Sequence, residues 1–367
     1  MKTAFITDWM EKYGGAERVV TAINEIYKFD FYYAYVNKMD ATTQQLTLGG
    51  NNITVIESNI LSLFKYKFRV LLPLFPWVIK EFNKQTKDNK IDLVISSSWA
   101  LSKGYRVGNE IHISYLQARN FKYVWDEAHL YFKGVVKLLS FLKPHLQKFD
   151  LVSAQNPNFL VSNSVFVQNW VKKKYNRESV VIYPPVDVES FEISEIKEDY
   201  FVIVGRIEPY KRFDVVIEAF NENGKQLVVI GDGTELKYLK SIAKENIKFL
   251  GFQKKDIIKI YLSKARAFVY AGVEDFGIAL VEAHASGIPV IAYNGGAAAE
   301  IIDATNGLCY DEQSPVALNN TVDDFLLKEK NYSKEIIRAS SLKFSKERFK
   351  TEFKQYVDEI VIKYNKK

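Results

Sequence analysis

Short apolar segments alternate with helical patterns along most of this chain, and this alternation restricts the possible fold more than any other feature. It is cleanest in the second half, where segments of four or five residues are separated by segments with helical spacing. Short buried strands that alternate with helices form a parallel sheet with helices on both faces. The second half is therefore predicted to be a doubly wound α/β domain. Its predicted strands are 201–205, 227–231, 247–251, 267–271, 289–293 and 307–310.

The first half opens in the same way. Residues 2–8 are predicted to form a buried strand, a loop with Gly14 and Gly15 follows, and residues 18–27 have helical spacing. A strand, a glycine turn and a helix are the start of a doubly wound domain. Because 367 residues exceed the usual size of one domain, we expect two such domains, each with its own core. Further strands of the first half are predicted at 31–36, 53–56, 92–96, 112–116 and 151–155.

The boundary between the two domains is predicted near Pro184 and Pro185, which stiffen the chain and stop a helix. An acid-rich segment, 189–199, follows the two prolines. We expect a first domain at 1–187, a second at 188–345, and a long amphipathic helix at about 346–367.

Composition excludes several classes of protein. The apolar fraction of 47% and the charged fraction of 26% exclude a disordered chain, a collagen and a coiled coil. A single cysteine, Cys309, excludes a disulfide framework, and four scattered histidines argue against a metal site. No apolar run approaches the ~20 residues of a membrane-spanning helix, and Asp8 interrupts the N-terminal run, so that a signal peptide is not expected. These observations predict a cytoplasmic protein.

The positive charge is concentrated in the first half. Residues 1–187 hold 24 Lys and Arg against 16 Asp and Glu, a balance of +8, and the remainder holds 26 against 28, a balance of −2. Segment 60–87 carries six basic residues, one acid and several aromatic residues, a mixture that suits an anionic membrane surface. The alternative is a pair of core helices, broken at Pro73 and Pro76, with their lysines in water. No groove-reading motif accompanies the charge, so nucleic acid is not an expected partner.

Polar residues follow the predicted strands of the second domain, at the edge where α/β sheets bind ligands. Arg206 and Lys211 follow the first of these strands, where two cations suit a diphosphate. A solvated basic loop is the alternative. Residues 231–233 (GDG) lack the third glycine of a dinucleotide-binding motif and are more typical of a tight turn into a helix.

Segment 274–282 (EDFGIALVE) is the most informative one. Gly277 can open a helix whose backbone N–H groups bind phosphate oxygens. Glu274 precedes this helix, and Glu282 lies within it, roughly 7 Å along its axis. Two carboxylates beside a phosphate site suit hydroxyl groups: those of a sugar on one side and of a ribose on the other. The alternative is a capping acid and an ordinary glutamate on the helix surface. Gly295-Gly296 and Gly14-Gly15 are further glycine-rich helix starts that suit a diphosphate.

Together these segments resemble the retaining glycosyltransferase family 4. The resemblance rests on GGAERVV at 14, NSVFV at 163, VIYPPVD at 181, GRIEPYKRFDVVIEAF at 205, VIGDGTEL at 229, FLGF at 249 and EDFGIALVEAHASGIPVIAYNGG at 274. It implies the GT-B fold, in which two Rossmann-like domains face each other across a cleft. The first domain would bind the acceptor, the second would bind the nucleotide sugar, and the C-terminal helix would cross back to the first. Within the family, the chain is most similar to bacterial mannosyltransferases of polysaccharide and O-antigen assembly.

The resemblance also implies roles for individual residues. Arg206 and Lys211 would hold the donor diphosphate in place of a metal ion, Glu274 would hold the donor sugar, and Glu282 would hold the ribose. The remaining donor contacts implied are Gly15 at the phosphate, Phe252 beside the base, and Gly205, Phe276, Gly277, Ile278 and Ala279 around phosphate and sugar.

One residue departs from the family pattern. Relatives commonly carry histidine near the reacting sugar where this chain has Gln117, which can bind a hydroxyl but cannot take a proton. His112, within a predicted strand, and His284, on the helix after Glu282, are expected to belong to the core.

The expected function is that of a retaining, metal-independent glycosyltransferase, peripheral on the inner face of the cell membrane. It would move a hexose from a nucleotide sugar to a lipid-linked saccharide of a bacterial surface polysaccharide or glycan. GDP-mannose is the favoured donor, and a UDP-hexose or UDP-N-acetylhexosamine is the alternative. No cofactor is expected. Two rival functions are those of a nucleotide-sugar epimerase of the same fold and of a non-catalytic nucleotide-sugar-binding subunit, while a dehydrogenase is disfavoured because the dinucleotide motif is incomplete.

Overall fold

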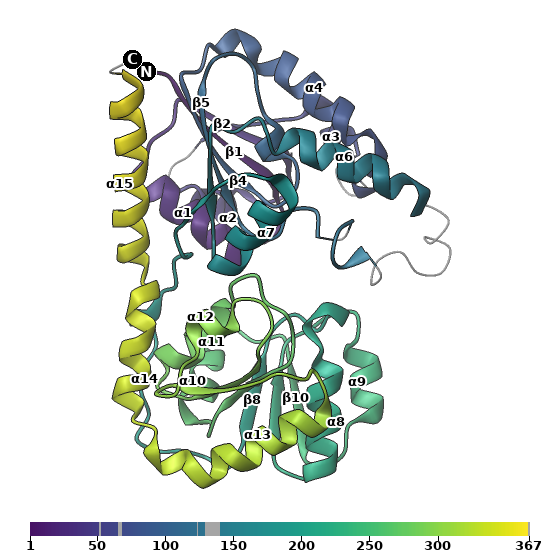
Figure 1. Cartoon of the computed structure of the whole chain (residues 1–367), viewed down its shortest axis with the longest axis vertical. Coiled ribbons are helices and arrows are strands. Elements are labelled where there is room, and N and C mark those ends of the chain that lie inside the picture. The colour runs from purple at the N-terminus through teal and green to yellow at the C-terminus, as the bar shows by residue number, and fades with distance from the viewer. Residues whose placement is uncertain (51–52, 65–67, 123, 129–139, 366–367) are drawn as a thin grey trace. The chain divides into compact units, whose positions relative to one another are not determined.

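The structure of the chain is a computed structural model that describes residues 1–50, 53–64, 68–122, 124–128 and 140–365 (Figure 1). The chain forms two compact units. The first comprises Met1–Pro185 and Phe349–Lys367, and the second comprises Val186–Arg348. Each unit contains one parallel sheet with helices packed on it. This confirms the predicted fold class of two Rossmann-like domains.

The first unit is built on a sheet that, within the described residues, has seven strands in the order β3-β2-β1-β4-β5-β6-β7, with all neighbours parallel. Parallel neighbours place the carboxyl ends of the strands at one edge of the sheet, which is where loops of functional interest begin. The strands are β1 Thr3–Met10, β2 Phe31–Asn37, β3 Val55–Glu57, β4 Leu93–Ser98, β5 Ile111–Leu116, β6 Phe159–Ser162 and β7 Val180–Val181.

Two separate cores cover the two faces of this sheet. Phe5 of β1 belongs to one core and its neighbours Ala4 and Ile6 to the other, because successive residues of a strand point to opposite faces. The first core contains α1 (Gly15–Ile26), and the second contains α3 (Asn59–Leu63), α4 (Phe75–Thr86) and α6 (Lys143–Ser153). The remaining helices of this part are α2 Ala41–Thr47 and α7 Val165–Tyr175, with the short 3-10 helices η1 Phe68–Leu74, η2 Lys87–Asn89 and η3 Ser102–Gly104.

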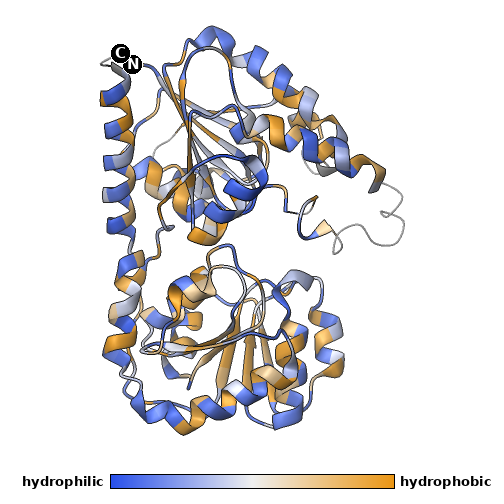
Figure 2. Cartoon of the chain, in the orientation of Figure 1, coloured by the Kyte–Doolittle hydropathy of each residue, from blue (hydrophilic) through white to orange (hydrophobic). Residues whose placement is uncertain are grey.

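The last helix, α15 (Lys346–Asn365), returns to the first unit, as the resemblance implied. Its Phe349, Phe353, Val357 and Ile360 are buried in the core that contains α1. An ion pair of 2.8 Å joins its Lys350 to Glu25 of α1. Figure 2 shows apolar and polar residues alternating along α15, the pattern of an amphipathic helix.

One predicted strand was wrong. Residues 151–155 were expected to form a strand, but Leu151–Ser153 end α6, and the strand β6 comes later, at Phe159–Ser162. Val152 is 61% exposed, as is usual on the outer side of an amphipathic helix, whereas Leu160 and Val161 are buried. A short apolar run alone does not distinguish a strand from the end of a helix.

The second unit is built on a sheet of six described strands in the order β10-β9-β8-β11-β12-β13, again with parallel neighbours. Figure 2 shows these strands in apolar colours, as expected of a sheet covered on both faces. All six predicted strands are confirmed: β8 Phe201–Val204, β9 Leu227–Ile230, β10 Ile247–Gly251, β11 Phe268–Tyr270, β12 Val290–Tyr293 and β13 Gly307–Tyr310. The helices are α8 Phe213–Asn223, α9 Leu236–Ile242, α10 Lys255–Lys264, α11 Ile278–Ala285, α12 Ala298–Ile301, α13 Pro315–Lys328 and α14 Lys334–Ser341, with the 3-10 helix η6 Pro209–Lys211.

The described residues of segment 60–87 include the end of α3, all of η1 and α4, and the first residue of η2. Pro76 lies in the first turn of α4, where the missing N–H costs nothing, and Pro73 lies within η1. Phe75, Val78, Ile79 and Phe82 are buried, so that one face of α4 is a core element. Lys65 and Lys67, which belong to the predicted membrane segment, lie outside the described residues. Among the described helices, none combines the length and apolarity needed to cross a bilayer.

Candidate functional site

The carboxyl ends of β8 and β11, which are neighbours in the second sheet, bring two of the predicted site residues together. Lys211 ends η6 after β8, and Glu274 follows β11. The Lys211 Nζ forms an ion pair with Glu274 Oε1, and the two side chains are only 16% and 18% exposed. Because an ammonium group has three N–H donors, Lys211 can bind a further anion while it contacts Glu274.

Tyr270, the last residue of β11, is a third member of this cluster that the sequence analysis missed. Its hydroxyl donates to the same Glu274 Oε1 that binds Lys211. Burial, together with the nearby carboxylate, raises the pKa of Tyr270 well above its ordinary value, so that the phenol stays protonated and keeps donating. With Oε1 bound twice, Glu274 presents Oε2 as the oxygen that can accept a hydrogen bond from a ligand hydroxyl.

The backbone of Glu274 is fixed as well as its side chain. Ala297 N donates to Glu274 O at 2.9 Å, and Gly296 pairs with Glu274 in an isolated parallel bridge. Gly296 has a φ of 74°, and a Cβ at this position would lie 2.1 Å from Glu274 O. The glycine pair after β12 therefore fixes the backbone of Glu274. Any side chain in place of Gly296 would displace that backbone.

The segment after Glu274 opens α11 as predicted. Gly277 caps the helix with a φ of 107°, and Leu280 N donates to its carbonyl oxygen at 3.0 Å. The N–H groups of Ile278 and Ala279, in the first turn, have no intrahelical acceptor and can bind an anion. Glu282 is the fifth residue of α11 and is partly buried.

Phe276 differs from the other residues of this segment. Its side chain is 3% exposed, and its ring packs against Phe344 with the centroids 5.3 Å apart. The ring therefore belongs to the core, and only the backbone of Phe276 can contact a ligand.

Two other predicted donor residues are exposed after strands β8 and β10, which β9 separates in the sheet. Arg206, directly after Gly205 at the end of β8, is exposed and donates from Nη2 to Tyr210 OH at 2.8 Å. Phe252 follows β10 and is 80% exposed. An aromatic ring left in water beside a strand end suits stacking on a planar ligand group.

In the first unit the structure brings Gln117 next to the loop of Gly15. Gln117 follows β5, and its Nε2 donates to Ser97 Oγ at 2.8 Å and to Ala16 O at 3.2 Å. Gly15 is the first residue of α1. Both N–H groups of the amide are thus used within the protein, which leaves the amide oxygen of Gln117 for a ligand hydroxyl.

Asp8 organises the same edge of the first sheet, although the sequence analysis considered it only as an interruption of an apolar run. The fully buried carboxylate accepts backbone N–H groups of four successive residues, Trp99 to Ser102, at 2.5–2.7 Å. Burial raises the pKa of Asp8, and the backbone hydrogen bonds oppose this shift. A polar residue near the carboxyl end of the first strand was the signal available in the sequence.

His112 and His284 belong to the core, as expected. His112 on β5 is 2% exposed and hydrogen bonds to Ser96 Oγ at 2.8 Å. His284 on α11 is fully buried, with Nε2 3.1 Å from Asn306 O. Neither imidazole is placed to contact a ligand.

The second unit therefore carries a site that can hold an anionic, hydroxyl-rich ligand. Arg206, Lys211 and the first turn of α11 offer positive charge and N–H donors, while Glu274 offers a fixed acceptor. Such a combination binds phosphate oxygens and sugar hydroxyls side by side.

Comparison with known proteins agrees with this chemistry. Residues 187–341 match the profile of the family described as Glycosyl transferases group 1. The chain is 30% identical over 192 residues to the O-antigen chain mannosyltransferase RfbU of Salmonella typhimurium, an alignment that covers 48% of this chain and 54% of that protein. It is 32% identical over 128 residues to a GDP-mannose-dependent alpha-mannosyltransferase of Corynebacterium glutamicum, covering 33% of this chain and 31% of that protein. The alignments thus span about half or less of the length of these curated relatives.

The fold of the whole chain is similar to that of solved structures. The Anabaena protein HepE, crystallised in complex with UDP, superposes with a TM-score of 0.73 at 17% sequence identity, covering 98% of this chain and 100% of that chain. The similarity extends over both units and agrees with the GT-B fold implied by the motifs.

Proposed function

We propose that this chain, as one of the glycosyl transferases of group 1, moves a hexose from a nucleotide sugar to a saccharide acceptor. In this proposal the transfer retains the configuration of the sugar. The cluster of Lys211, Tyr270 and Glu274 carries the proposal. It places a cation and a fixed carboxylate beside a helix start, as transfer from a sugar diphosphate requires. A binding subunit without catalysis would not need Glu274 to be held by two side-chain donors and by the loop of Gly296.

In this proposal the residues of the second unit act on the donor. Arg206, Lys211 and the N–H groups of Ile278 and Ala279 stabilise the negative charge that develops on the leaving diphosphate. Glu274 Oε2 accepts a hydroxyl of the transferred sugar, and Glu282 accepts the ribose hydroxyls. Phe252 lies beside the base, and the backbone of Gly205 and Gly277 lets the phosphates approach closely.

The acceptor is assigned to the first unit. Gln117 offers its amide oxygen to a hydroxyl of the acceptor, and the N–H of Gly15 suits a phosphate oxygen. Because glutamine cannot take a proton, the oxygen of the leaving phosphate accepts the proton of the acceptor hydroxyl as the new glycosidic bond forms. The reaction then needs no protein base and no metal ion.

GDP-mannose is the proposed donor, because two relatives are named as mannosyltransferases and one of them as GDP-mannose-dependent. A UDP-hexose is the alternative, and the complex of the Anabaena protein with UDP supports it. A lipid-linked saccharide is the proposed acceptor, since the basic and aromatic residues of segment 60–87 suit a membrane surface. The protein would then act while bound to the anionic inner face of the cell membrane.

A panel of donors tests this function. The protein is incubated with GDP-mannose, UDP-glucose, UDP-galactose and UDP-N-acetylglucosamine, each with and without a lipid extract that contains saccharide carriers, and the released nucleotide diphosphate is measured. We expect release from GDP-mannose that increases with the extract. Release from a UDP-sugar instead would move the assignment to that donor, and no release from any donor would contradict the transferase function.

Lys211→Ala tests the assigned role of this lysine, and Lys225→Ala is its matched control. If Lys211 stabilises the leaving diphosphate, its loss should lower turnover about a hundredfold or more, roughly 2.7 kcal/mol of barrier. Lys225→Ala, which removes a lysine paired with Asp323 elsewhere in the same unit, should leave turnover unchanged. Equal turnover of Lys211→Ala and wild type would refute the assigned role.

A further inference from the structure

The first unit contains a basic pocket between α4, α6 and the segment that follows η3. Its volume is about 470 Å³. Its basic lining residues are Lys80 and Lys84 of α4, Lys87 of η2 and Arg106, and its apolar ones include Ile79, Phe149 and Val152. No Asp or Glu is among its lining residues. A pocket with four cations, no acid and apolar walls suits an anionic group attached to an apolar body.

Most of this positive charge is not neutralised by the protein. Lys84 forms an ion pair of 2.8 Å with Glu81, but its side chain is 60% exposed, so the pair contributes little. Within the part of the chain that the structure describes, Lys80, Lys87 and Arg106 have no acidic partner within ion-pair distance. An anion can therefore bind these three cations without breaking an ion pair with a carboxylate.

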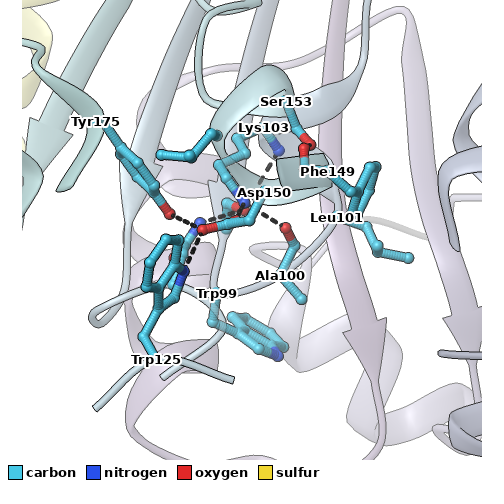
Figure 3. Close-up of polar contacts among 12 residues, drawn as sticks. Trp99, Ala100, Leu101, Lys103, Trp125, Phe149, Asp150, Ser153 and Tyr175 are labelled. Carbon is cyan, nitrogen blue, oxygen red and sulfur yellow. Dashed lines mark hydrogen bonds and ion pairs between the residues drawn. The ribbon is translucent and has the colours of Figure 1, made fainter. Parts of the chain in front are cut away.

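A buried ion pair holds two walls of the pocket in place. Lys103 of η3 contacts Asp150 of α6 at 2.7 Å, and neither side chain is exposed. Trp125 Nε1 and Tyr175 OH donate to the other oxygen of Asp150 at 2.8 and 2.7 Å (Figure 3). Breaking such a pair would leave an uncompensated buried charge, so that α6 and η3 are strongly held together.

The wall residues themselves flank this pair. Phe149 and Ser153 of α6 lie on either side of Asp150 in the sequence (Figure 3). Gly104, which also lines the pocket, follows Lys103. A Cβ on Gly104 would lie 2.7 Å from Ile79 Cδ1 and 3.2 Å from Ser153 Cβ, so that only glycine lets α4 and α6 approach η3 this closely. The pocket is therefore formed before any ligand binds.

Two further observations indicate which kind of ligand this pocket suits. The side-chain oxygen of Asn83, which lines the pocket, is buried and has no hydrogen-bond partner among the described residues. A ligand hydroxyl would satisfy it. In addition, large apolar side chains are exposed at the end of η1, on α4, on α6 and just before α6: Leu74 at 48%, Trp77 at 49%, Val152 at 61% and Phe141 at 71%. Exposed tryptophan and aliphatic residues beside lysines are typical of a membrane interface.

We propose that this pocket binds the phosphoglycerol head group of an anionic phospholipid while the surrounding apolar side chains enter the bilayer surface. The phosphate contacts Lys80, Lys87 and Arg106, and a head-group hydroxyl donates to Asn83. The inference rests on the membrane docking proposed above but not on glycosyl transfer, and it gives that docking a defined site, made of residues other than Lys65, Lys67 and Arg69.

Vesicle binding of the full chain tests the site. The triple variant Lys80→Ser, Lys87→Ser, Arg106→Ser is compared with Lys28→Ser, Lys173→Ser, Lys363→Ser, which removes the same charge from exposed positions elsewhere in the first unit. On vesicles of phosphatidylglycerol and phosphatidylcholine at low salt, the pocket variant should bind roughly a hundredfold more weakly than wild type, since each basic residue near an anionic surface contributes several-fold. The control variant should lose no more than a few-fold. Equal losses in both variants would overturn the proposal and leave only a general attraction by net charge.

A second pair of variants keeps the test decisive if the triple variant does not fold. Val152 is exposed, so Val152→Glu and Val152→Gln should both fold, and only the first places an acid in the pocket. Val152→Glu should bind phosphatidylglycerol vesicles roughly five- to tenfold more weakly than Val152→Gln. Equal binding by these two variants would contradict a head group in the pocket.

Competition distinguishes a lipid from a free anion. Soluble dihexanoyl-phosphatidylglycerol should displace the protein from vesicles at a concentration where inorganic phosphate does not, and equal competition by phosphate would overturn the assignment to a lipid. A wild-type protein that does not bind the vesicles would contradict both the docking and the pocket. Binding that every variant retains would contradict the pocket alone, and nucleotide release measures glycosyl transfer independently of either result.

Discussion

The hydroxyl of Tyr270 helps to fix the carboxylate of the proposed donor site. It shares Glu274 Oε1 with Lys211, so Tyr270→Phe should leave the carboxylate with one side-chain donor instead of two. A hydrogen bond to a charged group contributes about 1.5–3 kcal/mol, so turnover should fall by roughly one to two orders of magnitude. Donor affinity should change much less, because Tyr270 does not itself contact the diphosphate. Initial rates and donor binding by calorimetry measure the two effects separately.

Tyr310→Phe is the control for this prediction. Tyr310 is also a buried phenol of the second unit, and its hydroxyl donates to a backbone oxygen, that of Tyr270, at 3.0 Å. Its loss should reduce stability by about 1 kcal/mol and leave turnover nearly unchanged. If both variants lose turnover in proportion to their stability, Tyr270 has a structural role only.

Glu282 should distinguish ribose from deoxyribose. A carboxylate that accepts a ribose hydroxyl loses a charge-assisted hydrogen bond when the hydroxyl is missing, so the 2′-deoxy donor should react ~1–3 kcal/mol less favourably in kcat/KM with the wild-type enzyme. In Glu282→Ala this difference should largely disappear. A variant that still discriminates as strongly would show that Glu282 is an ordinary residue of the helix surface.

At the level of residues, the sequence predicted the part of the site that follows from strand ends. Lys211 and Glu274 lie 63 positions apart and yet meet, because β8 and β11 are parallel neighbours whose carboxyl ends share an edge. Tyr270 and Asp8 were missed for a different reason. Both belong to strands, Tyr270 as the last residue of β11 and Asp8 within β1. An aromatic ring in a strand is expected in the core, and a lone acid gives no indication of four backbone donors more than 90 positions away.

At the level of elements, alternation predicted all six strands of the second sheet, whereas the last strands of the first unit were less clear. Strands enclosed on both faces are uniformly apolar, and the second sheet consists of such strands bounded by glycine or polar turns. Residues 151–155 misled because α6 ends in an apolar run of strand length. The helix is recognisable only from its contacts: Asp150 binds Lys103, and Ser153 Oγ donates to Phe149 O at 2.5 Å.

The return of α15 to the first unit predicts that one substitution in this helix has a large effect on stability. Phe353 is fully buried, and its ring contacts Tyr115 and Phe349 with centroids 6.2 and 5.5 Å away. Phe353→Ala should therefore destabilise the first unit by about 3–5 kcal/mol. Phe353→Leu fills most of the same volume and should destabilise the first unit by less than half as much as Phe353→Ala. Urea denaturation measures both, and the exposed position Ile362→Ala should change stability by less than about 0.5 kcal/mol.

At the level of the whole molecule, each unit buries one histidine among its described residues, and burial makes it hard to charge. Burial lowers the pKa of His112 from its ordinary value of 6.5 to about 3, and that of His284 to about 4. In the unfolded chain both imidazoles take up a proton below about pH 6.5, whereas the folded protein does so only near pH 3–4. The free energy of unfolding therefore decreases as the pH falls through this window, by up to ~1.4 kcal/mol per pH unit for each histidine.

As the pH falls from 7 to 5, the buried histidine of each unit lowers the free energy of unfolding of that unit by about 2 kcal/mol. Because glutamine does not titrate, His112→Gln should lose this part of the acid sensitivity. Between pH 7 and pH 5, the free energy of unfolding of the first unit should decrease by about 2 kcal/mol less in His112→Gln than in the wild-type protein. Its amide can still hydrogen bond to Ser96, so the variant should fold. His145→Gln provides the comparison, since His145 lies exposed on α6. Urea denaturation of the three proteins at several pH values measures how the free energy of unfolding depends on pH. If this dependence is the same in His112→Gln and in the wild-type protein, His112 is charged in the folded protein.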